Sequence, residues 1–423
     1  MRKTMGTRVG TACSNSVHST SLRRLVVAKA MESGNIERPD IAFAFCTNKV
    51  NPSDFFDDIR KVVGEGVPIV GGSAIGVISN YFLSYGDFAA GIMVIQSETI
   101  RFRLRSAGGL DKDETATGER LIKDILQEQE EKDRLFMVFY DSIKMPPGPD
   151  SPPVMNSSSY LLAGIEKGLK KPIPIVGAGL VGDYDMNPTF QFCGSCVGTE
   201  QAVGLMLNGD FNTHYQIMHG CTPLDGVYHR ITKIKGPVLY ELDGRPIVEV
   251  INEMLGDEEW QKERPVDFLT IGVNYGERFG KYSEEGYVNR LITGVTPDKK
   301  GVVLFEPDLE DGVEIQFMVR DTERMVESAK RNTNLLLKSL TEKGARPVFG
   351  IYIDCAGRAG GYSNTGIEEA AEVQNLFNDY SVPLFGFYSG VEIAPLLGKS
   401  RGLDWTGVLL VLTEDDIITS ARH

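Results

Sequence analysis

The sequence predicts an α/β (α+β) protein of two domains, built from repeated strand–helix–strand units with mixed sheets. A short motif carries this prediction because it occurs three times: VPIVGGSAIG at 67–76, IPIVGAGLVGD at 173–183 and VPLFGFYSGVE at 382–392. In each copy a proline leads two apolar residues and a glycine. A helical pattern precedes each copy and an apolar run follows it, so the motif marks a repeated unit rather than a chance match.

The composition of the motif predicts both its structure and its use. Proline is tolerated at the first residue of a strand, where its missing N–H costs least. The glycines that follow permit a turn or the close approach of another group. A strand that ends in small residues is expected to leave a hollow at its carboxyl edge, where α/β proteins bind ligands.

Length and composition set the class of protein. A chain of 423 residues with 42% apolar and 24% charged residues is typical of a soluble globular protein with two or more domains. We predict one domain over 1–225 and a second over 226–423. The net charge of -14 argues against nucleic-acid and anionic-membrane partners. With no long apolar run and no apolar signal core at the N-terminus, the expected location is cytoplasmic.

Apolar periodicity predicts the elements of the first domain. Strands are expected at 8–12, 40–46, 88–96, 99–106, 135–140, 201–207 and 214–218, besides the two motif strands, and we expect 88–96 and 99–106 to pair. Helices are expected from Ser19 or Thr20 to Gly34, from a Ser53 cap to Gly64, at 121–126 and at 160–169. The Pro- and Ser-rich loop at 144–159 is a candidate partner surface, because loops of this length are commonly functional.

The second domain is predicted to contain a weaker third unit and a clear fourth one. A turn at 240–246 leads into a helix over 247–254, and the third unit follows with strands at 268–273, 301–306 and 312–319 and a helix at 283–292. Asp321 is expected to cap a helix to about 340. The fourth unit has a strand to Cys355, a glycine-rich loop at 356–366, a helix with a Thr365–Glu368 capping box, the last motif strand and a strand at 405–412.

Several motifs in order give the chain a family resemblance that covers nearly its whole length. They are GGSAIG at 71–76, AVGLMLNGD at 202–210, HGCTPL at 219–224, YELDGRP at 240–246, CAGRAGG at 355–361 and GFYSGVEIAP at 386–395. In these the chain resembles the FIST family, named for F-box and intracellular signal transduction proteins. The resemblance implies sensing of a small ligand, with amino acids among the ligands proposed for the family, and output to a signalling protein. Some relatives are reported to hold haem and respond to nitric oxide.

Five residues are the candidate ligand site: Ser73, Gly177, Cys355, Arg358 and Glu392. Cys355 and Arg358 follow a strand and precede a helix N-terminus, where free N–H groups attract an anion. Arg358 can bind a carboxylate with two parallel hydrogen bonds, and a buried Glu392 needs a partner. The two side chains either pair with each other structurally or are separated by an amino acid, with Arg358 on its carboxylate and Glu392 on its ammonium group.

Two cysteine-containing patterns offer alternatives to this site. Cys193 and Cys196 form a CxxC that could cycle as a dithiol, or bind zinc together with His219 and Cys221, although the single residue between the last two is awkward for chelation. The alternative of haem bound without covalent attachment would use His214, His219 or Cys193 as the iron ligand. Otherwise no metal or cofactor is expected.

Two further patterns argue against specific activities. Gly177-Ala-Gly-Leu-Val-Gly182 satisfies GxGxxG, but Pro188 and polar turn residues follow where a dinucleotide site needs a helix, so a tight turn is expected. Ser73 lies between glycines and alanine without the spacing of a hydrolase nucleophile. The sequence therefore favours a ligand-binding protein over an enzyme.

Overall fold

The computed structural model describes residues 6–127, 131–148, 153–363 and 365–414, and it confirms the mixed α/β class. Three units have the same element order of strand, helix, strand, helix and motif strand, followed by a hairpin and a closing strand. The first unit contains β1 (Arg8–Ser14), α1 (Thr20–Ser33), β2 (Ile41–Cys46), α2 (Pro52–Val63), β3 (Ile69–Ser73), hairpin β4 (Gly76–Ser79) and β5 (Phe82–Tyr85), and β6 (Ala90–Gln96).

The second and third units repeat this order. The second contains β7 (Ile100–Gly108), α3 (Glu114–Leu126), β8 (Asp133–Asp141), α4 (Ser158–Gly168), β11 (Ile175–Leu180), hairpin β12 (Gln191–Gly194) and β13 (Cys196–Gly198), and β14 (Gln201–Gly209). The third contains β15 (Asn212–Met218), α6 (Thr322–Glu342), β25 (Arg346–Cys355), α8 (Glu369–Asp379), β26 (Leu384–Ser389), hairpin β27 (Val391–Leu396) and β28 (Lys399–Leu403), and β29 (Gly407–Glu414). In every unit the motif strand runs parallel to the strand before its helix, as β2–β3, β8–β11 and β25–β26.

The hairpin that follows each motif strand leaves its own unit and joins another sheet. The strand orders are β1-β6-β2-β3-β12-β13, β7-β14-β8-β11-β27-β28 and β15-β29-β25-β26-β4-β5. Each sheet thus has four strands of one unit and a hairpin from the next, in a cycle around the three units. The predicted pairing of 88–96 with 99–106 is wrong, because β6 and β7 lie in different sheets where the chain passes between units.

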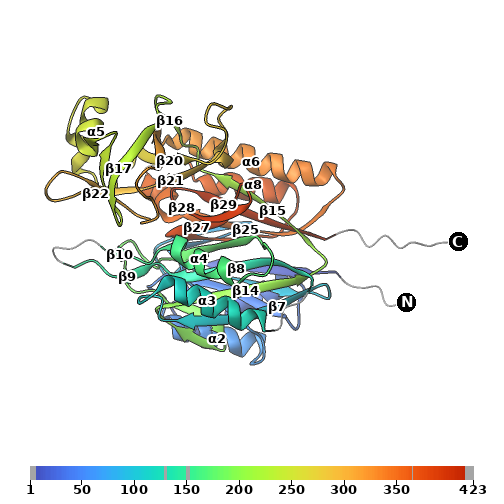
Figure 1. Cartoon of the computed structure of the whole chain (residues 1–423). Coiled ribbons are helices and arrows are strands. Elements are labelled where there is room, and N and C mark those ends of the chain that lie inside the picture. Colours follow the sequence, from blue (N-terminus) through green and yellow to red (C-terminus); the bar gives the residue numbers. More distant parts are fainter. Residues whose placement is uncertain (1–5, 128–130, 149–152, 364, 415–423) are drawn as a thin grey trace.

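The three sheets enclose one apolar core, and the helices cover their outer faces. The central core takes residues from all three units, and Phe45 stacks on Phe387 with ring centroids 3.8 Å apart. Separate outer cores lie under α1 and α2, under α3 and α4, and under α6 and α8. Figure 1 shows α2 and α3 at the bottom of the molecule and α6 and α8 at the top. The strand ends of the three units therefore surround one common centre.

A nine-stranded sheet interrupts the third unit between β15 and α6. Its strands are β16 (Thr222–Pro223), β17 (His229–Lys235), β18 (Val238–Leu242), β19 (Arg245–Pro246), β20 (Leu269–Asn274), β21 (Tyr287–Arg290), β22 (Ile292–Val295), β23 (Val302–Leu304) and β24 (Glu314–Val319), with helix α5 (Ile247–Leu255) against it. Figure 1 shows this insertion at the upper left. The strand–helix–strand unit predicted for 268–319 is wrong, because this region forms an antiparallel sheet. The helix predicted at 283–292 is also wrong, because a single 3-10 turn there is followed by strand β21.

Other expectations differ in detail. Asn51, not Ser53, caps α2, accepting from Asp54 N at 3.0 Å, whereas Ser19 and Asp321 cap α1 and α6 as predicted. The 144–159 segment contains the short pair β9 (Ile143–Met145) and β10 (Val154–Met155), and 149–152 lie outside the described residues. The boundary at 225 stays a prediction, since three sheets contain strands from both sides of it.

The motif glycines are required by the close approach of neighbouring backbones. Gly71, Gly177 and Gly386 lie at equivalent positions, opposite Ala44, Val138 and Tyr352 in the parallel pairs. A Cβ added to each would lie 2.0, 1.9 and 2.5 Å from the carbonyl oxygen of that partner. The hollow expected at these glycines is therefore filled by the protein's own backbone.

Replacing Gly177 by alanine is expected to lower the free energy of unfolding by about 1–3 kcal/mol, because overpacking at a buried backbone contact forces the strands apart. The matched control is Gly66→Ala, since Gly66 is exposed and an added Cβ there would meet no atom within 4 Å. Urea unfolding of both variants checks this. Equal midpoints for the two variants would contradict the role given to the motif glycine.

Candidate ligand site at the strand ends

The carboxyl ends of the three parallel strand pairs meet, as the repeats predicted. Asn48 N donates to Gly182 O at 3.0 Å, Gly390 N to Gly179 O at 2.9 Å, and Ile75 N to Tyr388 O at 3.2 Å. Each of these bonds joins two different units. Side chains from separate parts of the sequence are thereby collected at one end of the central core.

Glu392 is a buried acidic side chain at this end. It lies on β27, opposite Ala178 of β11, and so shares the face of that sheet that lines the central core. Its carboxyl group is fully buried, and Oε1 accepts a hydrogen bond from Ser389 Oγ at 2.9 Å. Within the described residues Oε2 has no hydrogen-bond partner. Burial raises the pKa of Glu392 well above its usual value, although the bond from Ser389 opposes this, so burial favours the protonated, neutral form of this carboxyl group.

Cys355 lies beside this carboxyl group at the end of β25. Its thiol is buried and is not in a disulfide. Burial raises the pKa of Cys355 well above its usual value, and Glu392 raises it further whenever it is ionised. Cys355 is therefore a neutral thiol, which can contact a ligand but is a weak nucleophile.

Gln191 occupies the position in β12 that Glu392 occupies in β27, one residue from the partner of the motif glycine. Its Nε2 donates to Thr189 Oγ1 at 2.8 Å, and this hydroxyl donates to Asp141 Oδ1 at 2.7 Å. Its Oε1 has no partner among the described residues. No sequence pattern indicated Gln191, because the exchange of hairpins places it here; Asp141, which was also not predicted, lies at the end of β8.

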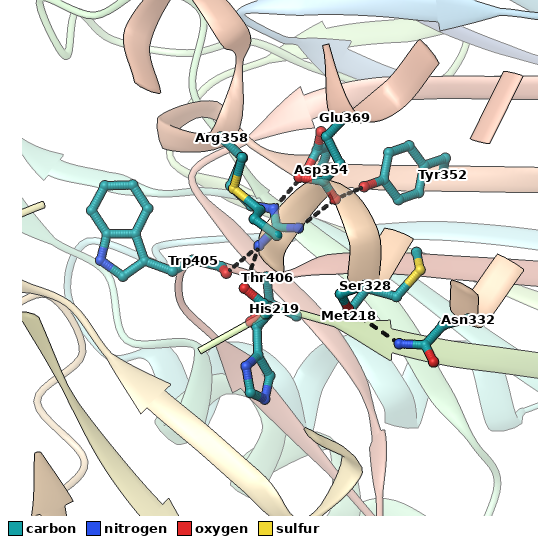
Figure 2. A network of polar contacts seen from close by, with 12 residues as sticks. Met218, His219, Ser328, Asn332, Tyr352, Asp354, Arg358, Glu369, Trp405 and Thr406 are labelled. Carbon is teal, nitrogen blue, oxygen red and sulfur yellow. Dashed lines mark hydrogen bonds and ion pairs between the residues drawn. The ribbon is translucent and has the colours of Figure 1, made fainter. Parts of the chain in front are cut away.

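Arg358 forms a closed network of its own (Figure 2). Its side chain is fully buried and donates to Asp354 at 3.2 Å, to Glu369, and to the carbonyl oxygens of His219 and Trp405 at 3.1 and 2.8 Å. The predicted pair of Arg358 with Glu392 is corrected, since the ion pairs of Arg358 in the described structure go to Asp354 and Glu369. Through these bonds Arg358 holds in place the loop that directly follows Cys355.

Two partly exposed tyrosines lie near Cys355. The rings of Tyr184 and Tyr362 stack with centroids 5.0 Å apart, and their side chains are 40% and 42% exposed. The hydroxyl of Tyr184 donates to Ala356 O at 2.9 Å. Burial raises the pKa of both tyrosines, and the nearby Cys355 contributes. This stacked pair is the part of the site that reaches solvent.

Glu368 also belongs to this region, and although it is the N-cap residue of α8 its side chain makes no capping hydrogen bond. It accepts from Tyr85 Oη at 2.7 Å and from Gly360 N at 2.9 Å. Helix α8 starts at Glu369 without a side-chain cap, so the predicted capping box of Thr365 and Glu368 is wrong. The loop expected at 356–366 also contains a 3-10 turn and a short helix, α7 (Gly360–Ser363).

The two remaining predicted site residues, Ser73 and Gly177, contact other parts of the protein and stabilise the fold locally. Ser73 Oγ donates to Asn48 Oδ1 at 3.1 Å and accepts from Phe190 N at 3.0 Å, so it fastens a turn. Gly177 lies inside β11 against Val138. After Gly182 the next element is strand β12, so the GxGxxG segment starts no helix, as predicted. Whether these residues touch a ligand stays a prediction.

The metal and haem candidates lie apart from one another. Cys193 and Cys196 lie on the β12–β13 hairpin, whereas His219 is buried beside Glu284 and Cys221. His219 Nδ1 accepts from Cys221 N at 3.0 Å and Nε2 donates to Glu284 O at 3.0 Å, so both ring nitrogens are used and His219 does not fit a metal or haem ligand. The described residues contain no cluster of three or more His, Cys, Asp or Glu suited to a metal.

For a haem, His214 and Cys193 remain as predicted ligands. His214 is half-buried on β15, and its Nε2 lies 3.0 Å from Thr413 Oγ1. Burial lowers its pKa, which favours the neutral ring, the form that binds iron.

A second buried polar cluster joins the inserted sheet to the three-unit body. Glu306 accepts from Ser158 N at 3.1 Å and from Ser157 Oγ at 3.3 Å, at the N-terminus of α4. Burial raises the pKa of Glu306 to about 8, and the carboxylates of Asp308 and Asp404 add to this. Asp308 itself pairs with Arg290.

The comparisons with known proteins agree with these observations. The FIST N domain model matches residues 40–245 and the FIST C domain model matches 248–395. The chain therefore belongs to the FIST family, whose domains are sensory domains of signal transduction.

Relatives and solved structures add little about chemistry. Uncharacterized protein Mb0898c of Mycobacterium bovis is 24% identical over 243 residues, which are 57% of this chain and 61% of that protein. Uncharacterized protein MJ1623 of Methanocaldococcus jannaschii is 27% identical over 180 residues, 38% of this chain and 32% of that one. The chain thus spans less than two thirds of these relatives.

A chorismatase structure resembles the chain with a TM-score of 0.38 at 9% identity, covering 97% of this chain and 99% of that one. A cyanuric acid hydrolase from A. caulinodans gives 0.35 at 9% identity and the same coverage. Neither score supports an inference about activity. Among the described helices, none combines the length and apolar character needed to cross a bilayer.

Arg358→Met is expected to lower the free energy of unfolding by about 3–5 kcal/mol, because it leaves the buried carboxylates of Asp354 and Glu369 without their cation. Glu392→Gln is expected to change it by less than about 1 kcal/mol at neutral pH, since glutamine resembles the protonated carboxyl group that it replaces. Chemical unfolding at pH 7 compares the two. A loss at Glu392→Gln as large as that at Arg358→Met would show that Glu392 has a charged partner.

Glu306 is expected to make the protein less stable as the pH rises from about 4.5 to about 8. Its pKa is higher in the folded state, so the folded protein keeps a proton that the unfolded chain releases, and stability falls by at most about 1.4 kcal/mol per pH unit in that range. Glu306→Gln should remove the decrease in stability that Glu306 causes. The free energy of unfolding of the variant should therefore exceed that of the wild type by an amount that grows with pH. Unfolding curves at several pH values test this, with exposed Glu98→Gln as the control. A constant difference from pH 5 to 8 would contradict it.

Proposed function

We propose that this FIST protein is a sensor that binds a small ligand with an amino group, such as an amino acid or a related metabolite, at Glu392. One observation carries the proposal: a fully buried carboxyl group has an oxygen, Oε2, without a hydrogen-bond partner in the described structure. Buried polar atoms are nearly always paired, because an unpaired one costs free energy. A donor brought by a ligand would supply the missing bond.

The groups around Glu392 suit an ammonium group better than an anion. Ser389 already donates to the carboxyl group, Cys355 is neutral, and the carboxyl of Asp354 also lies near enough to raise the pKa of Glu392. An arriving ammonium group favours the ionised carboxylate, because an opposite charge lowers the pKa of an acid. Binding of the amine would then release the proton of Glu392.

The rest of the predicted site takes supporting roles in this proposal. Arg358 is occupied by Asp354 and Glu369, so it positions the loop that carries Cys355 instead of binding the ligand carboxylate. The stacked Tyr184 and Tyr362 form the entrance, and their separation would open a path past Cys355. Because the two tyrosines belong to different units, binding would shift these units relative to each other, and a separate protein partner would detect that change.

A thermal-shift screen of amino acids and other small primary amines tests this function. A ligand at about 100 times its Kd stabilises the protein by about 2.7 kcal/mol, and the matching compounds without the amino group should give no shift. Glu392→Gln should weaken binding about 10- to 150-fold, the equivalent of about 1.5–3 kcal/mol for a hydrogen bond to a charged group. Glu98→Gln, the same change on the surface, should bind like the wild type.

Two outcomes would contradict the proposal. In one, no compound in a broad panel of amines shifts the melting temperature. In the other, a ligand binds equally well to wild type and Glu392→Gln, which would place its site elsewhere.

A further inference from the structure

The β12–β13 hairpin presents two cysteines in a geometry that the proposed ligand site does not use. Cys193 and Cys196 are direct partners across the antiparallel pair, separated by a two-residue turn, Gly194-Ser195. Directly opposed residues in such a pair place their Cα atoms about 4.5–5.5 Å apart with side chains on the same face. A disulfide needs Cα atoms about 4.4–6.8 Å apart. The hairpin therefore meets the backbone requirement for a disulfide without rearrangement.

The surroundings of the hairpin distinguish these two thiols from the others. All six cysteines are free thiols in the structure, and Cys196 is the exposed one. A Cβ added at Gly194 would meet no atom within 4 Å, so the turn beside the thiols is open to a small reagent. Burial raises the pKa of Cys13, Cys46 and Cys221 to about 12, and that of Cys355 well above its usual value.

We propose that Cys193 and Cys196 form a reversible dithiol–disulfide site whose substrates are small-molecule disulfides of the glutathione type. The thiolate of Cys196 attacks one sulfur of the disulfide RSSR, forming Cys196–S–S–R and releasing RS⁻. The thiolate of Cys193 then attacks the Cys196 sulfur, forming the Cys193–Cys196 bond and releasing the second RS⁻. The two cysteine protons convert both leaving groups to thiols, so the protein loses two electrons and RSSR gains them.

The order of attack follows from exposure. Cys193 is half-buried against the central core, and burial raises its pKa, whereas Cys196 stands at the surface. Cys196 is thus the thiol that meets the reagent and Cys193 the one that resolves the mixed disulfide. Exposed disulfides are easily reduced, which makes the bond reversible.

The hairpin connects this site to the fold. Cys193 lies opposite Val70 of β3, and Gly194 opposite Ile69, so the cysteines belong to the hairpin that the second unit gives to the first. Arg60 donates to Ser195 O at 3.3 Å and fastens the turn to α2. Oxidation would lock the tip of this exchanged hairpin.

Incubation of the folded protein with glutathione disulfide tests the proposal. The number of free thiols should fall from six to four, and the mass of the intact protein should decrease by two hydrogen atoms. Peptide mapping should find the peptides of Cys193 and Cys196 linked by a disulfide. Cys193→Ser should keep glutathione on Cys196 as a lasting mixed disulfide, and Cys196→Ser should lose no thiol. Retention of all six thiols, or a lasting glutathione adduct on wild-type Cys196, would overturn the proposal.

Failure here is distinguishable from failure of the ligand proposal. Glu392→Gln should oxidise like the wild type, because Glu392 lies on β27 and not on this hairpin. Unfolded wild-type protein, in which all six thiols are accessible, serves as the control for the reagent.

Discussion

The close approach of backbones at three equivalent glycines is the constraint on which this fold depends. Each motif strand lies between the preceding strand of its own unit and a hairpin from another unit. At Gly177 the neighbours are Val138 on one side and Ile393 on the other. A side chain at this position would press on the carbonyl of Val138 and loosen the sheet where two units join. The motif repeats because the same junction is built three times.

The exchange of hairpins also builds the candidate site. Glu392 belongs to the hairpin of the third unit, pairs with β11 of the second, and is held by Ser389 at the end of β26. A carboxyl group inside an apolar core is normally costly. Within the part of the chain that the structure describes, only one of the two carboxyl oxygens of Glu392 has a hydrogen-bond partner. The N–H groups of Arg358, in contrast, donate to nearby carboxylate and carbonyl oxygens. The fold thus places a network whose cation, Arg358, is fully paired near a carboxyl group, Glu392, whose Oε2 has no partner among the described residues.

The sequence predicted those features that depend on neighbouring residues. The Pro–Gly motif predicted the three motif strands, and local patterns predicted most helices and the caps at Ser19 and Asp321. The pairing of 88–96 with 99–106 failed because adjacent strands normally pair, whereas here the chain leaves one unit between them. The helix at 283–292 failed because the pairing of β21 with β20 outweighs its local pattern.

The candidate site was predictable only in part for the same reason. Cys355, Arg358 and Glu392 were found because they follow strand ends, and all three lie at the same end of the fold. The partners of Arg358 were missed, although Asp354 at the end of the same strand was a usable signal. Gln191 had none, since its placement depends on a hairpin that crosses to another unit, whereas Asp141, at the end of β8, offered a signal of the same kind as Asp354.

The central claim is that Glu392 Oε2 is an acceptor reserved for a ligand amine. Its most direct test is a high-resolution crystal structure with the amine that stabilises the protein most. The account predicts the nitrogen of that compound about 2.7–2.9 Å from Oε2, the distance of a charge-assisted hydrogen bond, with the two tyrosine rings moved apart. A structure in which the compound binds elsewhere, while Oε2 is bonded to a protein group, would contradict it.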